Sequence, residues 1–167
     1  METLISFVGS GQGLAILGAS LAVGLACGGS GQGVGVVGEA GSGVLAEDPN
    51  KFAQILILQI IPGTQGLYGL VAWFFCLMKI GFFGGAGIVE LTVNQGLMVG
   101  AACLPIGIGG LLTAYAQGRT AAAVVNMIVK RPEELAKGII MCIMVEFYAI
   151  LCLLATFLML NGFSFLA

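Results

Sequence analysis

GIIMCIMVEFYAILCLLATFLML, residues 138–160, is the clearest indication in this chain of how it folds. The stretch is predominantly apolar and contains one charged side chain, Glu146. A helix needs about 20 apolar residues to cross a bilayer, and this stretch supplies them. Three further long apolar runs cover residues 14–44, 53–78 and 97–129. The sequence therefore predicts an all-α membrane protein with four transmembrane helices.

The composition supports a membrane location and excludes several other classes of protein. Of the 167 residues, 59% are hydrophobic, 28 are glycine and only 8% are charged. An ordinary soluble domain has about 25% charged residues. Six Lys and Arg residues cannot form the basic surface of a nucleic-acid binder. The chain has no His, which excludes imidazole-based metal sites and general bases.

Two short charged segments that contain proline divide the apolar runs into hairpins. They are AEDPNK at residues 46–51 and KRPEE at residues 130–134, and proline flanked by charges is typical of a tight turn between helices. We expect a first hairpin over residues 1–79, a loop over 80–92 and a second hairpin over 93–167. The expected helices cover about residues 12–45, 53–78, 95–129 and 136–160.

The distribution of basic residues predicts the orientation in the membrane. Lys51, Lys130, Arg131 and Lys137 lie in or beside the two proline turns, whereas Lys79 alone lies on the opposite side. Cytoplasmic loops carry an excess of Lys and Arg. We therefore expect a multi-pass protein with cytoplasmic turns and extracytoplasmic termini.

The two hairpins resemble each other in sequence. A Gln-Gly pair recurs at residues 32–33 and 117–118, and the turn prolines are Pro49 and Pro132. The Gln-Gly pairs are 85 residues apart and the prolines are 83 residues apart. The two repeats therefore align after a shift of two positions. Because both turns face the same side, the pattern indicates a duplicated hairpin in parallel repetition.

Glycine is concentrated in the first predicted helix. Gly24 and Gly28 form one small-xxx-small pair, and Gly31 and Gly35 form another, a pattern that lets helices approach closely in lipid. Glycine on several faces indicates a helix with close neighbours on more than one side, as in the inner layer of a ring of copies. The GxGxxG match at residues 33–38 lies inside this helix, without the strand that a dinucleotide site requires.

Glu146 is the side chain that most needs an explanation. An ionised carboxylate near the middle of a bilayer costs about 3 kcal/mol or far more. Glu146 must therefore be protonated, paired with a cation or in contact with water. Arg119 lies at a different depth, which disfavours a structural ion pair. When the two turn prolines are aligned, the first hairpin has Gly63 where the second has Glu146.

The second predicted helix carries oxygen-bearing groups on one face. Spacings of three, four and seven residues place them on the same side of a helix. Pro62 lies among them and cannot donate a hydrogen bond to the preceding turn, so it loosens the helix and exposes main-chain carbonyls. The groups on this face are Ile61, through its carbonyl, Thr64, Gln65 and Tyr68.

These groups lie at the same depth as two polar residues of the second hairpin. Gln65, Gln117 and Glu146 are each 13 to 15 residues from a basic residue at a turn, which corresponds to about 20 Å of helix. One carboxylate with neutral oxygens is a ligand set for a hard cation, and its single charge suits a monovalent one. The alternative is that Thr64 and the two amides only hold the helices together by hydrogen bonds.

Three segments together carry a resemblance to a known family. QILILQIIPGTQGLYG at residues 54–69, AQGR at 116–119 and MVEFYA at 144–149 resemble the proteolipid (K or c) subunit of V-type ATPases, especially its sodium-pumping bacterial branch. The resemblance covers essentially the whole chain. It implies a homo-oligomeric ring in the bacterial plasma membrane that turns against a stator. It also implies a non-catalytic subunit, with ATP hydrolysed elsewhere in the complex.

The resemblance also implies a Na⁺ site and a set of partners. The implied ligands are Glu146, Gln117, Gln65, Thr64 and the main-chain carbonyl of Ile61, with Tyr68 locking the carboxylate. The implied partners are identical subunits, a stator subunit of the a or I type, membrane lipid, and a central-shaft subunit of the d or C type at the cytoplasmic turns. Phe147 departs from the family pattern, which has a small hydroxyl residue after the carboxylate.

Two other functions are compatible with the buried carboxylate. One is a rotor ring that translocates H⁺. A protonated Glu146 is neutral and so also avoids the cost of a charge in the bilayer. A stand-alone four-helix exporter that exchanges protons for a drug also uses a membrane glutamate. The duplication and the amide cluster favour the rotor over the exporter.

Overall fold

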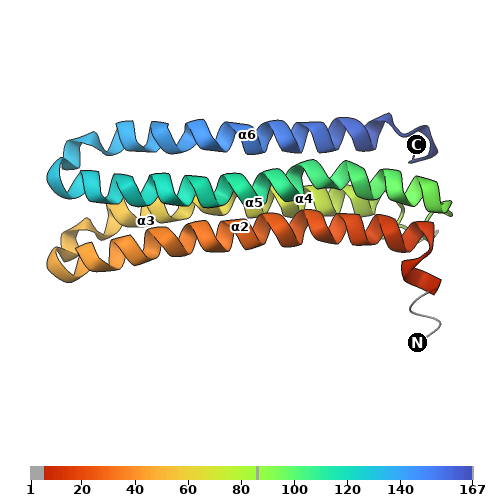
Figure 1. Cartoon of the computed structure of the whole chain (residues 1–167), viewed down its shortest axis with the longest axis horizontal. Helices are drawn as coiled ribbons and strands as arrows, with labels where there is room; N and C mark the ends of the chain where they lie inside the picture. Colours follow the sequence, from red (N-terminus) through yellow and green to blue (C-terminus); the bar gives the residue numbers. More distant parts are fainter. Residues whose placement is uncertain (1–5, 86, 167) are drawn as a thin grey trace.

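A computed structural model describes residues 6–85 and 87–166 as long helices that run along one axis (Figure 1). The first hairpin consists of α2 (Gly11–Glu47), α3 (Phe52–Ile60) and α4 (Thr64–Lys79), and a 3-10 turn over Ile61–Gly63 joins α3 to α4. The second hairpin consists of α5 (Val93–Lys130) and α6 (Leu135–Gly162). Within the described residues, four helical stretches are long and apolar enough to cross a membrane: Gly11–Glu47, Pro49–Lys79, Val93–Lys130 and Pro132–Gly162.

Both proline turns lie at one end of the bundle, and the segment between α4 and α5 lies at the other end (Figure 1). Each proline begins a short 3-10 turn, Pro49–Lys51 or Pro132–Glu134, because its fixed φ and missing N–H suit a first helical position. The side chain of Asp48 caps the first of these turns by accepting a hydrogen bond from the Asn50 N–H at 3.1 Å. The two hairpins therefore run in the same direction, as parallel repetition requires.

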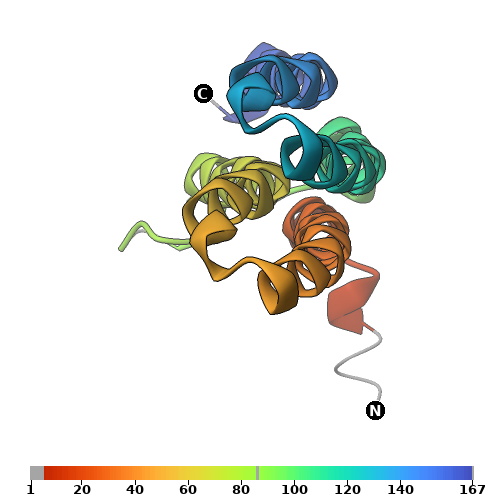
Figure 2. The ribbon, with the colours of Figure 1, turned by 90° about the vertical axis from the view of Figure 1, so that its left-hand side faces the viewer.

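Helices α2 and α5 pack side by side through glycine (Figure 2). A Cβ atom at Gly118 would overlap the Cα of Gly33, and a Cβ atom at Gly18 would overlap the Cα of Gly100. Any side chain at these positions would collide with the neighbouring backbone. Glycine therefore permits backbone-to-backbone packing of α2 on α5 and sets the two helices at matching depth.

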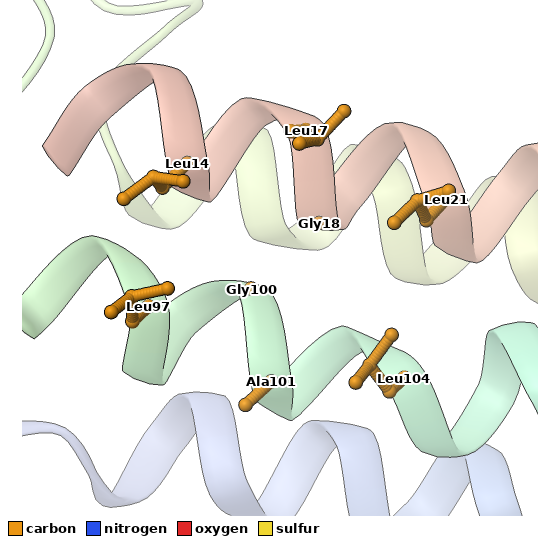
Figure 3. Close-up of a pocket in the computed structure, with 8 residues that line it drawn as sticks. All are labelled: Leu14, Leu17, Gly18, Leu21, Leu97, Gly100, Ala101 and Leu104. Atoms are coloured by element: carbon orange, nitrogen blue, oxygen red, sulfur yellow. The ribbon is translucent and has the colours of Figure 1, made fainter. Parts of the chain in front are cut away.

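The close approach of Gly18 to Gly100 leaves an apolar groove between the two helices. The groove has a volume of about 230 Å³. Figure 3 shows leucines of both helices along its sides, with Gly18 and Gly100 between them. Its lining residues are Leu14, Leu17, Gly18, Leu21, Leu97, Gly100, Ala101 and Leu104.

Helix α6 lies at the edge of the bundle and packs mainly on α5 (Figure 2). Large apolar side chains project from it, such as Met144 with 63% of its surface exposed and Leu158 with 64%. A soluble monomer rarely leaves so many large apolar side chains on one helix open to water. This face is suited to contact with lipid or with other membrane subunits.

Candidate ion-binding site

The helix of the first hairpin that faces α6 is interrupted where Pro62 lies. The 3-10 turn over Ile61–Gly63 replaces the α-helical pattern there, because Pro62 has no N–H to donate. The carbonyl of Ile61 accepts hydrogen bonds from the Thr64 N–H and from the Thr64 hydroxyl, the latter at 3.0 Å. The interruption thus places a main-chain carbonyl and a hydroxyl side by side within the membrane-spanning region.

Helix α2 supports this interruption through Ser30, a residue that was not predicted to belong to the site. Ser30 is 6% exposed, and its Oγ accepts a hydrogen bond from the Gly66 N–H at 2.8 Å. On the same helix, the thiol of Cys27 lies 3.7 Å from the Gly66 carbonyl. The sequence does show Ser30 as a lone hydroxyl in a run of glycine and alanine. Its partner, however, is a main-chain N–H on another helix, which no sequence pattern predicts.

The two glutamines predicted at one depth meet in the interior. Gln65 and Gln117 are both 0% exposed. The Nε2 of Gln65 donates to the Oε1 of Gln117 at 2.6 Å, and the Nε2 of Gln117 donates to the carbonyl of Cys142 at 2.9 Å. Three helices, α4, α5 and α6, are therefore joined at a single level. The part played by the Cys142 carbonyl was not predicted.

The carboxylate of Glu146 lies one helical turn beyond Cys142 and is half-buried. Its Oε1 accepts a hydrogen bond from the Tyr68 hydroxyl at 2.5 Å. The Thr64 hydroxyl donates to the Oε1 of Gln65 at 3.3 Å, so this hydroxyl and the two amides form one hydrogen-bonded group. Among the described residues, the Glu146 carboxylate is hydrogen-bonded to Tyr68 and to neither of the two amides.

Glu146 has no cationic partner among residues 6–85 and 87–166. The ion pair found there joins Lys137 to Glu134 at 2.6 Å near the second turn. The same residues contain no cluster of three His, Cys, Asp or Glu side chains. The polar groups near this level are therefore the Glu146 carboxylate with its Tyr68 partner, and a hydrogen-bonded set of amide, hydroxyl and carbonyl oxygens from Gln65, Gln117, Thr64 and Ile61.

Phe147 does not enter this polar group. Its side chain is 53% exposed, and its ring packs against the ring of Tyr148 at 6.1 Å between centroids. The departure from the expected small hydroxyl residue therefore changes the outer surface of α6 beside the carboxylate.

The family model that describes the C subunit of ATP synthase matches the chain twice, over residues 17–76 and 100–159. This chain belongs to the ATP synthase C-subunit family. The two matches begin at residues 17 and 100, the same offset that separates Pro49 from Pro132, so the duplicated hairpin is confirmed.

Curated relatives come from several organisms. The chain is 45% identical over 131 residues to the V-type sodium ATPase subunit K of Enterococcus hirae, covering 78% of this chain and 80% of the relative. It is 38% identical over 149 residues to the A-type ATP synthase subunit K of Methanocaldococcus jannaschii, covering 89% and 62% respectively. It is 35% identical over 68 residues to the 16 kDa proteolipid of the V-type proton ATPase of Nephrops norvegicus, covering 41% and 43%.

These findings establish the general role of the chain. It is a rotor proteolipid of a V-type or A-type ATPase, a non-catalytic membrane subunit that forms a ring and works with other ATPase subunits. The predicted family, the all-α fold with duplicated hairpins and the absence of a catalytic role are confirmed. The multi-pass membrane character is confirmed as well.

Proposed function

We propose that this proteolipid carries Na⁺ across the membrane at the site around Glu146. The observation that carries the proposal is the meeting of one carboxylate and several neutral oxygen donors at a single level between α4, α5 and α6. Such a set compensates one positive charge and replaces the hydration shell of the ion. The proposed ligands are side-chain oxygens of Glu146, Gln117, Gln65 and Thr64, with the main-chain carbonyl of Ile61.

A bound Na⁺ explains how Glu146 passes the lipid during rotation. An ionised carboxylate alone pays a large penalty in hydrocarbon, whereas the neutral ion–carboxylate pair avoids most of it. Tyr68 holds the carboxylate from α4 through its hydroxyl and so acts as a lock on the ion. Transport against 100 mV costs about 2.3 kcal/mol per charge, which ATP hydrolysis supplies for a few ions.

The choice of Na⁺ draws support from one of the relatives. The protein from Enterococcus hirae that is 45% identical to this chain is described as part of a sodium ATPase. The amide and hydroxyl residues that the resemblance implies as Na⁺ ligands, Gln65, Gln117 and Thr64, are all present here in addition to the carboxylate.

The same role implies specific partners and a specific orientation. At a stator subunit of the a or I type, a basic residue and an aqueous half-channel displace the ion from Glu146. A shaft subunit of the d or C type docks on the two proline turns, which lie at one end of the bundle (Figure 1). The excess of Lys and Arg at that end favours cytoplasmic turns and extracytoplasmic termini in a bacterial plasma membrane.

The decisive experiment measures how fast a hydrophobic carbodiimide labels Glu146 in the detergent-solubilised ring. The reagent attacks the protonated carboxyl group, so a bound cation protects it. Labelling is followed from pH 5 to 9 with Na⁺, with K⁺ at equal ionic strength, and without either ion. We expect millimolar Na⁺, and not K⁺, to slow labelling strongly.

A rotor that translocates H⁺ is the second candidate, and one observation favours it. In the structure, the amides of Gln65 and Gln117 satisfy each other and the Cys142 carbonyl without any cation. If labelling follows pH alone and is indifferent to Na⁺, the Na⁺ proposal is wrong. Thr64 and the two glutamines then act as hydrogen-bonding contacts between helices.

A further inference from the structure

Helix α4 carries an exposed apolar stripe on the face turned away from α2. A Cβ atom at Gly69 would overlap the Cβ of Ala26, so that side of α4 packs against α2. The stripe lies on the other side, where spacings of three and four residues keep its members in line. Because α4 belongs to a span long and apolar enough to cross a membrane, this stripe is suited to lipid. Its members, all exposed, are Leu67, Val71, Phe74 and Met78.

The chain turns back on itself at the end of α4. Gly81 has a φ of +77°, a left-handed conformation that glycine adopts without strain. The N–H of Phe82 donates to the carbonyl of Leu77 at 2.9 Å, and the N–H of Gly81 donates to the carbonyl of Met78 at 3.0 Å. These two hydrogen bonds form a Schellman motif, which ends a helix and redirects the chain. The residues that follow are therefore directed back toward α4.

The reversal brings two phenylalanines onto the apolar stripe. The ring of Phe83 lies 5.3 Å from the ring of Phe74 and 6.2 Å from the ring of Trp73, measured between centroids. The ring of Phe82 packs edge-on against Phe83 at 5.4 Å. Phe82 and Phe83 are still 47% and 52% exposed. We call residues 81–84 the aromatic hook, and the hook extends the stripe by two rings.

The aromatic hook lies at the depth of a bilayer interface. Trp73 and Phe74 are eight and nine residues beyond Gln65 in α4, which corresponds to about 12–14 Å of helix. One half of the hydrocarbon core is about 15 Å thick. If the level of Gln65 and Glu146 is the bilayer middle, these two aromatic residues lie at its outer boundary. Aromatic side chains are concentrated at this boundary in membrane proteins.

The aromatic hook also lies on a side of the bundle that the other helices leave open. Figure 2 shows the segment between α4 and α5, in green, projecting beyond α4 and away from α2 and α5. The two family-model matches end at residue 76 and resume at residue 100, so the hook belongs to the connection between the repeats.

We propose that the aromatic hook is an interfacial anchor, which inserts among phospholipids at the end of the bundle opposite the proline turns. Its partner is the boundary between headgroups and acyl chains, since a contiguous apolar patch at this depth is covered by lipid. In the ring, one hook from each subunit forms a girdle that holds the ring, and with it Glu146, at a fixed depth. The anchor does not depend on which ion the ring carries.

Tryptophan fluorescence tests the anchor, because Trp73 is the single tryptophan of the chain. A second reporter chain combines Phe83→Trp with Trp73→Phe and so moves the tryptophan into the hook. Rings of each full-length chain are reconstituted in phospholipid vesicles containing lipid brominated either near the headgroup or near the end of the acyl chain. We expect both tryptophans to be quenched more by the first lipid than by the second, and only weakly by acrylamide in the water.

One substitution tests whether the chain reversal places the hook in the lipid. In the Phe83→Trp reporter chain, Gly81→Val should lose most of the lipid quenching and gain quenching by acrylamide. A Cβ at Gly81 would lie 2.9 Å from the Gly87 carbonyl, and its φ is one that valine rarely adopts. Gly85→Val is the matched control, because nothing lies within 4 Å of a Cβ there, and it should keep the lipid quenching.

Three results would overturn the proposal. Strong quenching of the Phe83→Trp reporter by acrylamide, without quenching by brominated lipid, would place the hook in water. Protection of this reporter from both quenchers would mean that another protein chain covers the hook. Equal lipid quenching with and without Gly81→Val would mean that the Schellman motif does not hold the hook in place. Quenching of Trp73 in the unaltered chain shows, in each case, that the ring itself is inserted in the vesicles.

Discussion

The two hairpins of this chain share a sequence plan but make different contributions to the site. The first has a transmembrane helix interrupted at Ile61–Gly63 and supplies neutral groups, whereas the second has the continuous helix α6 and supplies the carboxylate. Two polar links of the site cross between the hairpins, since Tyr68 reaches Glu146 and Gln65 reaches Gln117. A duplicated chain can therefore keep one complete site while its halves specialise.

The largest expected effect comes from removing the charge of the second hairpin. Glu146→Gln keeps the size of the side chain and removes the anionic ligand, so Na⁺ transport driven by ATP should fall to background in reconstituted vesicles. Carbodiimide labelling at this position should disappear. Normal pumping by this variant would contradict the proposed site.

Moving the carboxylate to the first hairpin tests whether the two halves are interchangeable. In the variant Gly63→Glu with Glu146→Gln, the new side chain has room, because only Val34 comes near, at 3.9 Å from a Cβ at that position. It lies two residues from Gln65, however, and so on a different face of the helix. We expect no recovery of transport, measured against Glu146→Gln alone. Recovery would mean that the surrounding oxygens matter little.

Truncating either glutamine tests whether the neutral oxygen ligands contribute to Na⁺ binding. Gln117→Ala removes an oxygen donor and leaves the Cys142 carbonyl without its side-chain partner, a loss of about 1–3 kcal/mol. Na⁺ protection against carbodiimide should then need roughly 5-fold to 150-fold more Na⁺, while labelling without Na⁺ persists. Gln65→Ala should shift the Na⁺ dependence in the same direction. An unchanged Na⁺ dependence in both variants would favour the proton rotor.

The smallest expected effect concerns the lock between the hairpins. Tyr68→Phe removes only the hydroxyl that donates to Glu146 and keeps the ring. A hydrogen bond of this kind contributes about 1 kcal/mol, so the Na⁺ affinity should fall roughly fivefold. Release of ²²Na⁺ from the loaded ring should become faster, because the carboxylate is held less firmly. A slower release would show that Tyr68 does not act as a lock.

Much of the site was predictable because spacing along a single helix determines which side chains share a face and a depth. Spacings along one helix place Thr64, Gln65 and Tyr68 on one face, and the distance from the turns predicts the shared depth of Gln117 and Glu146. The structure joins these side chains by hydrogen bonds between helices. Their role as ion ligands stays a prediction.

The contributions of Ser30 and of the Cys142 carbonyl were not predictable in the same way. Ser30 becomes important because the interruption at Pro62 brings the Gly66 N–H to α2. The carbonyl of Cys142 is a main-chain group that any residue could supply, and only the position of Gln117 selects it. Such pairings depend on how far each helix is rotated about its axis, which no spacing along a single helix specifies.

The four apolar spans, the two proline turns, the duplication and the single carboxylate are all evident from the sequence, because hydrophobic length and charge decide what can enter a bilayer. Which faces of the helices meet depends instead on how the folded helices pack. Contact between Gly33 and Gly118 fixes the depth and rotation of α5 against α2, and this contact carries Gln117 inward and Arg119 outward. The physical reason is steric, since glycine allows several close packings and the side chains around it select one.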